Sequence, residues 1–133
     1  MPTGFLDTKK QDQAIIENYT DNPKYLFARC HYAQLCLHNG KIEKIPEIFE
    51  NKFDLKVLYP RRNLFHANEY AAFTEVLCLY FNMIGKREKL EATYKSMKQT
   101  IPDATETESI RLILEPPVFQ RLKERLIATF SRS

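Results

Sequence analysis

The chain has 133 residues, of which 44% are apolar and 28% are charged, and its 20 basic and 17 acidic residues leave a net charge of +3. This composition predicts a single folded domain over residues 1–133, because a chain of this length buries a sizeable core and is too apolar for disorder. Three glycines are too few for an all-β fold with its many tight turns, and a charge of +3 alone does not indicate a nucleic-acid partner.

Cysteine usage and hydropathy bear on where the chain resides. The three cysteines form an odd set, which favours reduced thiols over a disulfide framework. The N-terminus "MPTGFLDTKKQDQ" lacks the basic region and apolar run of a signal peptide. The longest nearly uncharged stretch, "YAAFTEVLCLYFNMIG", is short for a membrane span and is interrupted by Glu75. We therefore expect a cytoplasmic protein that does not enter a membrane.

The first half of the chain carries the start and stop signals of helices. A first helix is expected over about residues 9–19. The next begins with Asn22 as N-cap and Pro23 at the first helical position, and the Asn-Gly pair at 39–40 ends it in a left-handed conformation. A further helix begins immediately afterwards, over about 41–51.

The second half repeats this arrangement after a connector. Residues 53–59, "FDLKVLY", alternate only loosely, and we interpret them as a connector, with one helical turn at most, rather than as a strand. A helix over 67–84 ends at Gly85, and its partner runs over 86–100 until Pro102 stops it. The helix over 67–84 is apolar on two faces, so we expect it to be packed on both sides.

The remaining elements complete an all-α fold. Thr105 and Glu108 have the spacing of a capping box at the start of a helix, and two prolines then precede a last helix over 117–131, which is expected to cover the end of the structure. The sequence thus predicts six or seven helices, with antiparallel hairpins over about 23–53 and 66–101. They would form either a short α-α superhelix or an irregular bundle.

The two predicted hairpins contain a similar ten-residue segment. "GKIEKIPEIF" at 40–49 recurs 45 positions later as "GKREKLEATY" at 85–94. Over about 25–102 the chain resembles the tetratricopeptide (TPR) repeat family, whose pattern sets apolar, small and aromatic residues around a glycine turn. The matching residues are Leu77, Cys78, Phe81, Gly85, Leu90, Tyr94 and Pro102 in the second hairpin, and Tyr32, Ala33, Cys36, Gly40, Ile45, Phe49 and Val57 in the first.

The chain departs from the family pattern at named places. Thr74 and Arg29 stand where the family has an early Trp, and Leu90 and Ile45 replace a small residue of the second helix. The repeat distance of 45 also exceeds the family's period of about 34, and it would suit HEAT-like repeats equally well.

The resemblance implies a partner-binding face and no catalysis. In this family the first helices of the repeats line a groove for a protein or peptide. The residues that map to that groove are Phe27, Cys30, Gln34, Glu75, Leu79 and Asn82. The Lys and Asn that clamp a C-terminal carboxylate in chaperone-binding members are missing at those places. We therefore expect a non-catalytic protein–protein interaction module, with a second copy of the chain as one candidate partner.

No catalytic, cofactor or metal site is predicted. The segment "CHYAQLCLH" at 30–38 is the best candidate for zinc, but only His31 and His38 share a face, and they lie about 10 Å apart along the helix, too far to bind one ion. No phosphate loop or hydrolase motif is present. His66 and Glu69 could form an acid–base pair, but near a helix start we interpret them as capping residues.

Nucleic-acid binding is the second candidate function. Basic residues cluster around the connector and on the last helix, and Tyr59 and Phe65 could stack on bases of single-stranded RNA. The two clusters are Lys56, Arg61 and Arg62, and Arg121, Lys123 and Arg125. We favour a solvated surface as the explanation of both clusters, since acidic residues lie nearby.

Overall fold

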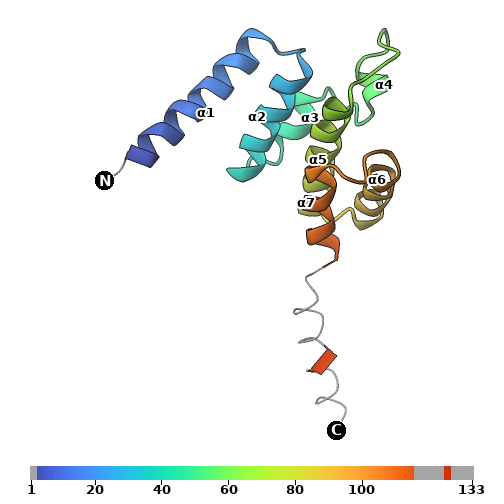
Figure 1. Ribbon diagram of the computed structural model, residues 1–133. Helices are drawn as coiled ribbons and strands as arrows, with labels where there is room; N and C mark the ends of the chain where they lie inside the picture. The colour runs from blue at the N-terminus through green and yellow to red at the C-terminus, as the bar shows by residue number, and fades with distance from the viewer. Residues whose placement is uncertain (1–2, 116–124, 127–133) are drawn as a thin grey trace.

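The fold is described from a computed structural model of the chain (Figure 1). It describes residues 3–115 and 125–126, with side chains from residue 7 onward. Most of the helix expected over 117–131 lies outside these residues. Within residues 3–115 the chain forms seven α-helices and no strand, in agreement with the predicted all-α class. The helices are α1 Thr3–Asp21, α2 Leu26–His38, α3 Lys44–Ile48, α4 Leu55–Leu58, α5 Ala67–Met83, α6 Arg87–Thr100 and α7 Thr105–Leu114.

Two successive helix pairs, α2–α3 and α5–α6, occupy the predicted hairpin regions. The connector between them makes the single helical turn α4, as expected. In the part of the chain that the structure covers, none of the helices combines the length and the apolar character needed to cross a membrane.

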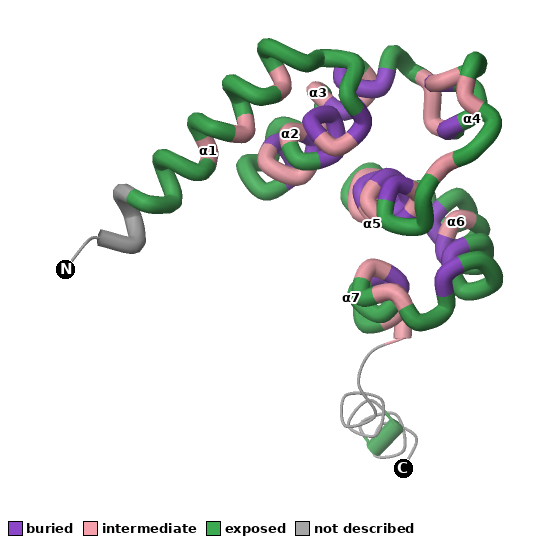
Figure 2. The backbone as a smooth tube through the Cα atoms, turned by 45° about the horizontal axis from the view of Figure 1, so that its top comes forward, coloured by how far each residue is buried: buried purple, intermediate pink, exposed green. Residues whose placement is uncertain are grey.

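Helix α5 is the centre of the fold. It contacts α2, α6 and α7, which confirms that the helix predicted over 67–84 is packed on more than one side. Its buried apolar residues are Ala71, Phe73, Val76, Leu77, Cys78 and Phe81. The apolar faces predicted for this helix are not buried along their whole length, because Met83 and the C-cap residue Ile84 are exposed. Figure 2 shows buried backbone concentrated in α2, α5 and α6.

Both helix pairs reverse direction at a glycine. Gly40 and Gly85 each have a φ of 75°, a left-handed conformation that glycine adopts without steric penalty. The Lys86 N–H donates to the Phe81 carbonyl at 2.9 Å, and Lys41 makes the corresponding bond at 2.8 Å. These bonds define a Schellman motif, which confirms the predicted left-handed helix ends.

Helix α2 begins later than its sequence signals suggest. The N-cap is Tyr25 rather than Asn22, so Pro23 is not in the helix. The Tyr25 N–H donates to the Asn22 carbonyl at 3.1 Å, which closes a turn before the helix. The Pro23 carbonyl accepts a bond from Nε of Arg29 at 2.9 Å. This tertiary contact fixes the turn, and local sequence does not reveal it.

Helix α3 is much shorter than the predicted helix over 41–51. Pro46 has no N–H, and its ring would clash with the Ile42 carbonyl if the helix began at residue 41. The helix also ends early, because Glu50 and Asn51 take left-handed φ values of 54° and 59°. The second helix of the first pair therefore has five residues, against fourteen in α6.

The starts of α5 and α7 give opposite outcomes for the capping predictions. The Glu69 carboxylate accepts a bond from the His66 N–H at 2.9 Å, so these two residues form a helix cap as predicted. The capping box predicted for Thr105 and Glu108 is wrong. Ala104 is the N-cap of α7, and the Glu108 carboxylate pairs instead with an arginine one turn further along the helix.

Helix α1 extends away from the rest of the molecule. It contains the helix predicted over 9–19 and is longer at both ends. Only its C-terminal part packs on α2, where the rings of Tyr19 and Tyr32 stack at 4.5 Å between centroids. Its N-terminal half projects from the other helices, and most of its described side chains are exposed (Figures 1 and 2).

Candidate functional site

A groove lies between α2 and α5, the first helices of the two pairs, and we call it the α2–α5 groove. Its volume is about 590 Å³. Ile15 of α1 and Ser109 of α7 also line it. Because α1 packs on α2 and α7 packs on α5, these two residues stand at opposite edges.

Four of the six predicted partner-binding residues line this groove: Gln34, Glu75, Leu79 and Asn82. Cys30 does not, because the N-terminal turns of α2 are packed into the core and its side chain is fully buried. A partner in the groove could not contact Cys30, so this residue is not part of the candidate site. Phe27 is half-buried outside the groove, with its ring 5.9 Å from that of Tyr25 and 6.3 Å from that of His31.

One hydrogen bond joins the two sides of the groove. The Gln34 side-chain amide donates to the Glu75 carboxylate at 2.9 Å. Glu75 is half-buried, and burial raises the pKa of its carboxyl, as does the nearby negative charge of Glu106, while the bond from Gln34 lowers it. Among the described residues, no ion pair neutralises Glu75. The groove therefore carries an acidic group that is only partly hydrated.

Sequence reasoning missed several groove residues. His31 and His38 lie on the same face of α2 as Gln34, at intervals of three and four residues, so helical spacing alone could have identified them. Met83 lies one turn after Leu79 on α5 in the same way. In contrast, the edge positions on α1 and α7 depend on how distant helices pack, for which a single sequence carries no signal.

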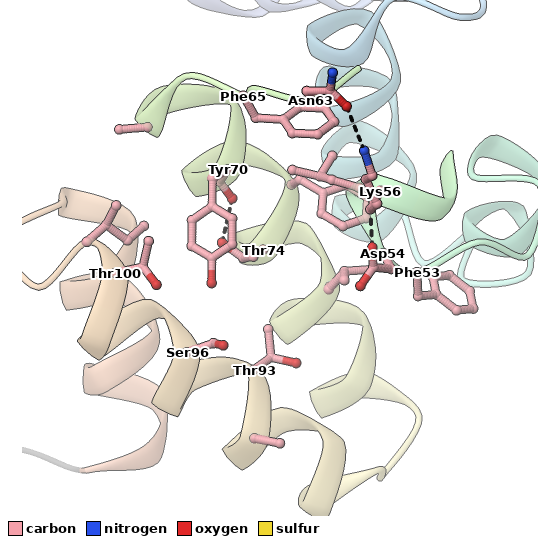
Figure 3. A pocket seen from close by; sticks show the side chains of 16 residues that line it. Phe53, Asp54, Lys56, Asn63, Phe65, Tyr70, Thr74, Thr93, Ser96 and Thr100 are labelled. Atoms are coloured by element: carbon pink, nitrogen blue, oxygen red, sulfur yellow. Dashed lines mark hydrogen bonds between the residues drawn. The ribbon is translucent and has the colours of Figure 1, made fainter. Parts of the chain in front are cut away.

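A second, larger cavity lies on another side of α5, and we call it the connector cleft. Its volume is about 730 Å³, and residues from the connector, α5 and α6 line it (Figure 3). None of the six predicted partner-binding residues is among them.

The basic patch around the connector is largely used within the fold. Arg62 makes a bidentate ion pair with Glu69, with both nitrogen–oxygen distances at 2.8 Å. The Lys56 ammonium donates to the Arg62 carbonyl at 3.0 Å and to the Asn63 side-chain oxygen at 3.1 Å. Only Arg61 of this patch is exposed without such a contact among the described residues.

The aromatic residues of the connector are also engaged. The Tyr59 hydroxyl donates to the Lys24 carbonyl at 2.6 Å. The guanidinium of Arg62 lies 4.4 Å from the centroid of the Phe65 ring. Neither ring is a free platform for a base in this conformation. Of the basic patch predicted on the last helix, the described residues include only Arg125, which is exposed.

The cysteines and histidines of α2 separate as helical geometry requires. Cys30 and Cys36 are buried free thiols, while His31 and His38 are exposed at the groove. Burial raises the pKa of the Cys30 thiol to about 12. Over the described part of the chain, no three His, Cys, Asp or Glu side chains gather closely enough to hold a metal ion.

No protein-family model, no curated protein and no solved structure matches this chain.

Proposed function

We propose that the chain is a non-catalytic, cytoplasmic protein-interaction module of TPR-like type, which binds a protein or peptide segment in the α2–α5 groove. The observation that carries this proposal is the Gln34–Glu75 hydrogen bond across the groove, with Leu79 and Asn82 beside it. Residues from the first helices of two successive helix pairs thus form one continuous surface. Helical repeats bind partners in this way.

The repeat interpretation is supported by burial at equivalent positions of the two pairs. Among the seven matched positions Val57 is exposed and Tyr32 is only half-buried, but four others are buried in both pairs, 45 residues apart, although their side chains differ. These positions are Ala33 and Cys78, Cys36 and Phe81, Ile45 and Leu90, and Phe49 and Tyr94. The two positions of the family's early Trp, Arg29 and Thr74, are buried as well.

A capture experiment with matched variants tests the proposal. Asn82 is an exposed groove residue, so Asn82→Arg should fill the groove without disturbing the fold, whereas Gln99→Arg makes the same change at an exposed position of α6 that lines neither cavity. The full chain and both variants would be used to capture partners from native cell extract, before and after nuclease treatment. We expect Asn82→Arg to lose the captured protein while Gln99→Arg keeps it, with melting temperatures unchanged.

Two outcomes would contradict the proposal. Equal capture by all three proteins would place the interaction outside the groove. Loss of capture after nuclease treatment, with steep weakening by salt, would favour nucleic-acid binding instead.

A further inference from the structure

The connector cleft has the size of a small-molecule site. Small-molecule pockets in proteins have volumes of about 300–1,000 Å³, and the cleft falls within this range at about 730 Å³. Helix α6 forms one wall, residues 53–56 and 63–67 form the other, and α5 forms the floor. The floor is part of the packed core, because Phe73 and Leu77 are buried core residues.

Side-chain hydroxyls converge on this cleft. Thr93, Ser96 and Thr100 stand along the side of α6 that faces it, and the Tyr70 hydroxyl points from α5 toward that row (Figure 3). The Thr93 hydroxyl already donates to a carbonyl of its own helix at 2.8 Å. Within the described residues, the hydroxyls of Tyr70, Ser96 and Thr100 make no hydrogen bond. Three hydrogen-bonding groups are therefore available to a ligand.

The charges on the cleft are already paired with the protein. Among the described residues, Asp54 and Lys56 are the only charged ones that line it. The Asp54 carboxylate accepts bonds from the backbone N–H groups of Lys56 and Val57 at 2.8 and 3.4 Å. The Lys56 ammonium donates to two oxygens of the connector. A charged ligand would lose hydration here without gaining a free counter-charge, which is unfavourable.

Aromatic rings provide the apolar part of the site. Phe65 on the connector side and Tyr70 on the α5 side border the cleft and are half-buried, whereas the Phe53 ring points away from it (Figure 3) and stacks on Tyr80 at 5.8 Å between centroids. We propose that the connector cleft binds an uncharged, ring-containing small molecule. Its rings pack against Tyr70 and the apolar side chains of Phe73 and Leu77 that line the α5 side of the cleft. Its hydrogen-bonding groups meet the hydroxyls of Ser96 and Thr100.

A pair of fluorescent probes tests this proposal on the full chain. N-phenyl-1-naphthylamine is uncharged, and 8-anilino-1-naphthalenesulfonate carries the same rings with an added sulfonate. We expect saturable binding of the uncharged probe, with one molecule per chain, and affinity for the anionic probe lower by about tenfold or more. Failure of the uncharged probe to bind saturably, or equal affinity for the two probes, would overturn the proposal.

Three variants locate the binding. Ser96 is exposed on the cleft side of α6, so Ser96→Phe fills the cleft while the helix is retained, and Gln99→Phe is the control on the same helix. We expect Ser96→Phe to lower the affinity for the uncharged probe by about tenfold or more. Gln99→Phe and the groove variant Asn82→Arg should bind the uncharged probe with an affinity within about twofold of that of the original chain.

The same variants show which result would refute the site. If a folded Ser96→Phe protein, verified by circular dichroism and thermal melting, binds the probe normally, the cleft is not the site. If Asn82→Arg abolishes probe binding, the probe occupies the α2–α5 groove, and the cleft proposal is wrong. Neither result bears on partner capture, which tests the groove separately.

Discussion

The two helix pairs have the same turn and different second helices. Gly40 and Gly85 share a φ of 75° and the same pair of backbone hydrogen bonds. Yet α3 has five residues and α6 has fourteen. The reversal of the chain is therefore a local property of the glycine turn, whereas the length of the second helix depends on the residues beyond that turn.

The ends of the two second helices show where the difference arises. Helix α6 stops next to Pro102, which cannot continue a helix. Helix α3 stops at two left-handed residues, Glu50 and Asn51, neither of which is glycine. The buried guanidinium of Arg29 bonds the Glu50 carboxylate at 2.8 Å. Thus the first pair ends beside a tertiary ion pair, and the second beside a proline visible in the sequence.

The largest effects are expected from the aromatic core residues at equivalent places, Phe49 and Tyr94. Phe49 is fully buried and packs edge-to-face on Phe73 at 5.4 Å, so Phe49→Ala should lower the free energy of unfolding by about 3–5 kcal/mol. Tyr94→Ala should have a similar or slightly smaller effect, because 6% of Tyr94 remains exposed. Urea unfolding followed by circular dichroism measures both. Two separate transitions in either variant would mean that the pairs unfold independently.

The ion pair at the connector should have the next largest effect. The bonds from Arg62 to Glu69 lower the pKa of this carboxyl to about 2. Because this value lies below the unfolded one of 4.5, the stabilisation is complete above pH 4.5 and is lost as the pH falls toward about 2. Since Arg62 is partly exposed, Glu69→Gln should cost only about 1–2 kcal/mol at pH 7.

The pH profile provides the check on this prediction. Unfolding free energies of the original chain and Glu69→Gln should converge as the pH is lowered from 5 to about 2. Parallel profiles over this range would show that the carboxylate does not titrate with folding. Glu91→Gln removes an exposed ion pair within α6 and serves as the control for a simple change of surface charge.

Substitution of the two turn glycines should have an effect of about the same size as loss of the ion pair, and an equal effect in the two helix pairs. A Cβ built at Gly40 or Gly85 meets no atom within 4 Å, so steric clash with neighbours is absent. The cost of Gly40→Val or Gly85→Val is then the backbone strain of a β-branched residue at positive φ, about 1–2 kcal/mol each. Thermal melting of the two variants measures the difference directly. A much larger loss in one pair would mean that its turn has a further role.

The sequence was informative where structure is local. The turns at Gly40 and Gly85 and the cap formed by His66 and Glu69 depend on residues a few positions apart. The short α3 was partly foreseeable, since Pro46 restricts where a helix can begin. Its early end was not, because Glu50 and Asn51 take left-handed conformations that are uncommon for residues other than glycine, and the contact of Glu50 with an arginine twenty-one residues away is not visible in the local sequence.

The sequence also predicted part of the candidate site, and only that part. The resemblance to TPR repeats placed Gln34 and Glu75 on one surface, and the structure brings them into hydrogen-bonding contact. It also placed Cys30 there, although the packing of the N-terminal turns of α2 buries this thiol. The connector cleft was missed entirely, because it is formed by side chains from three segments that approach each other only in the fold.

The smallest effect is expected at Glu75, the acidic residue of the groove. Its raised pKa means that the folded state holds its proton more tightly, so its charge lowers stability as the pH rises above 4.5. Glu75→Gln should therefore leave stability at pH 7 unchanged or raise it by about 0.5 kcal/mol or less. A clear loss in thermal melting would show that the carboxylate supports the fold rather than remaining available to a partner.

The reactivity of the buried thiols can report when each helix pair opens. Cys30 and Cys36 belong to the first helix pair and Cys78 to the second, and burial raises the pKa of both Cys30 and Cys78 to about 12. Only the thiolate reacts with an alkylating reagent, so each thiol is protected until its helix pair opens. Brief exposure to iodoacetamide, followed by mass spectrometry of the peptides, would time the opening of each pair without any engineered label.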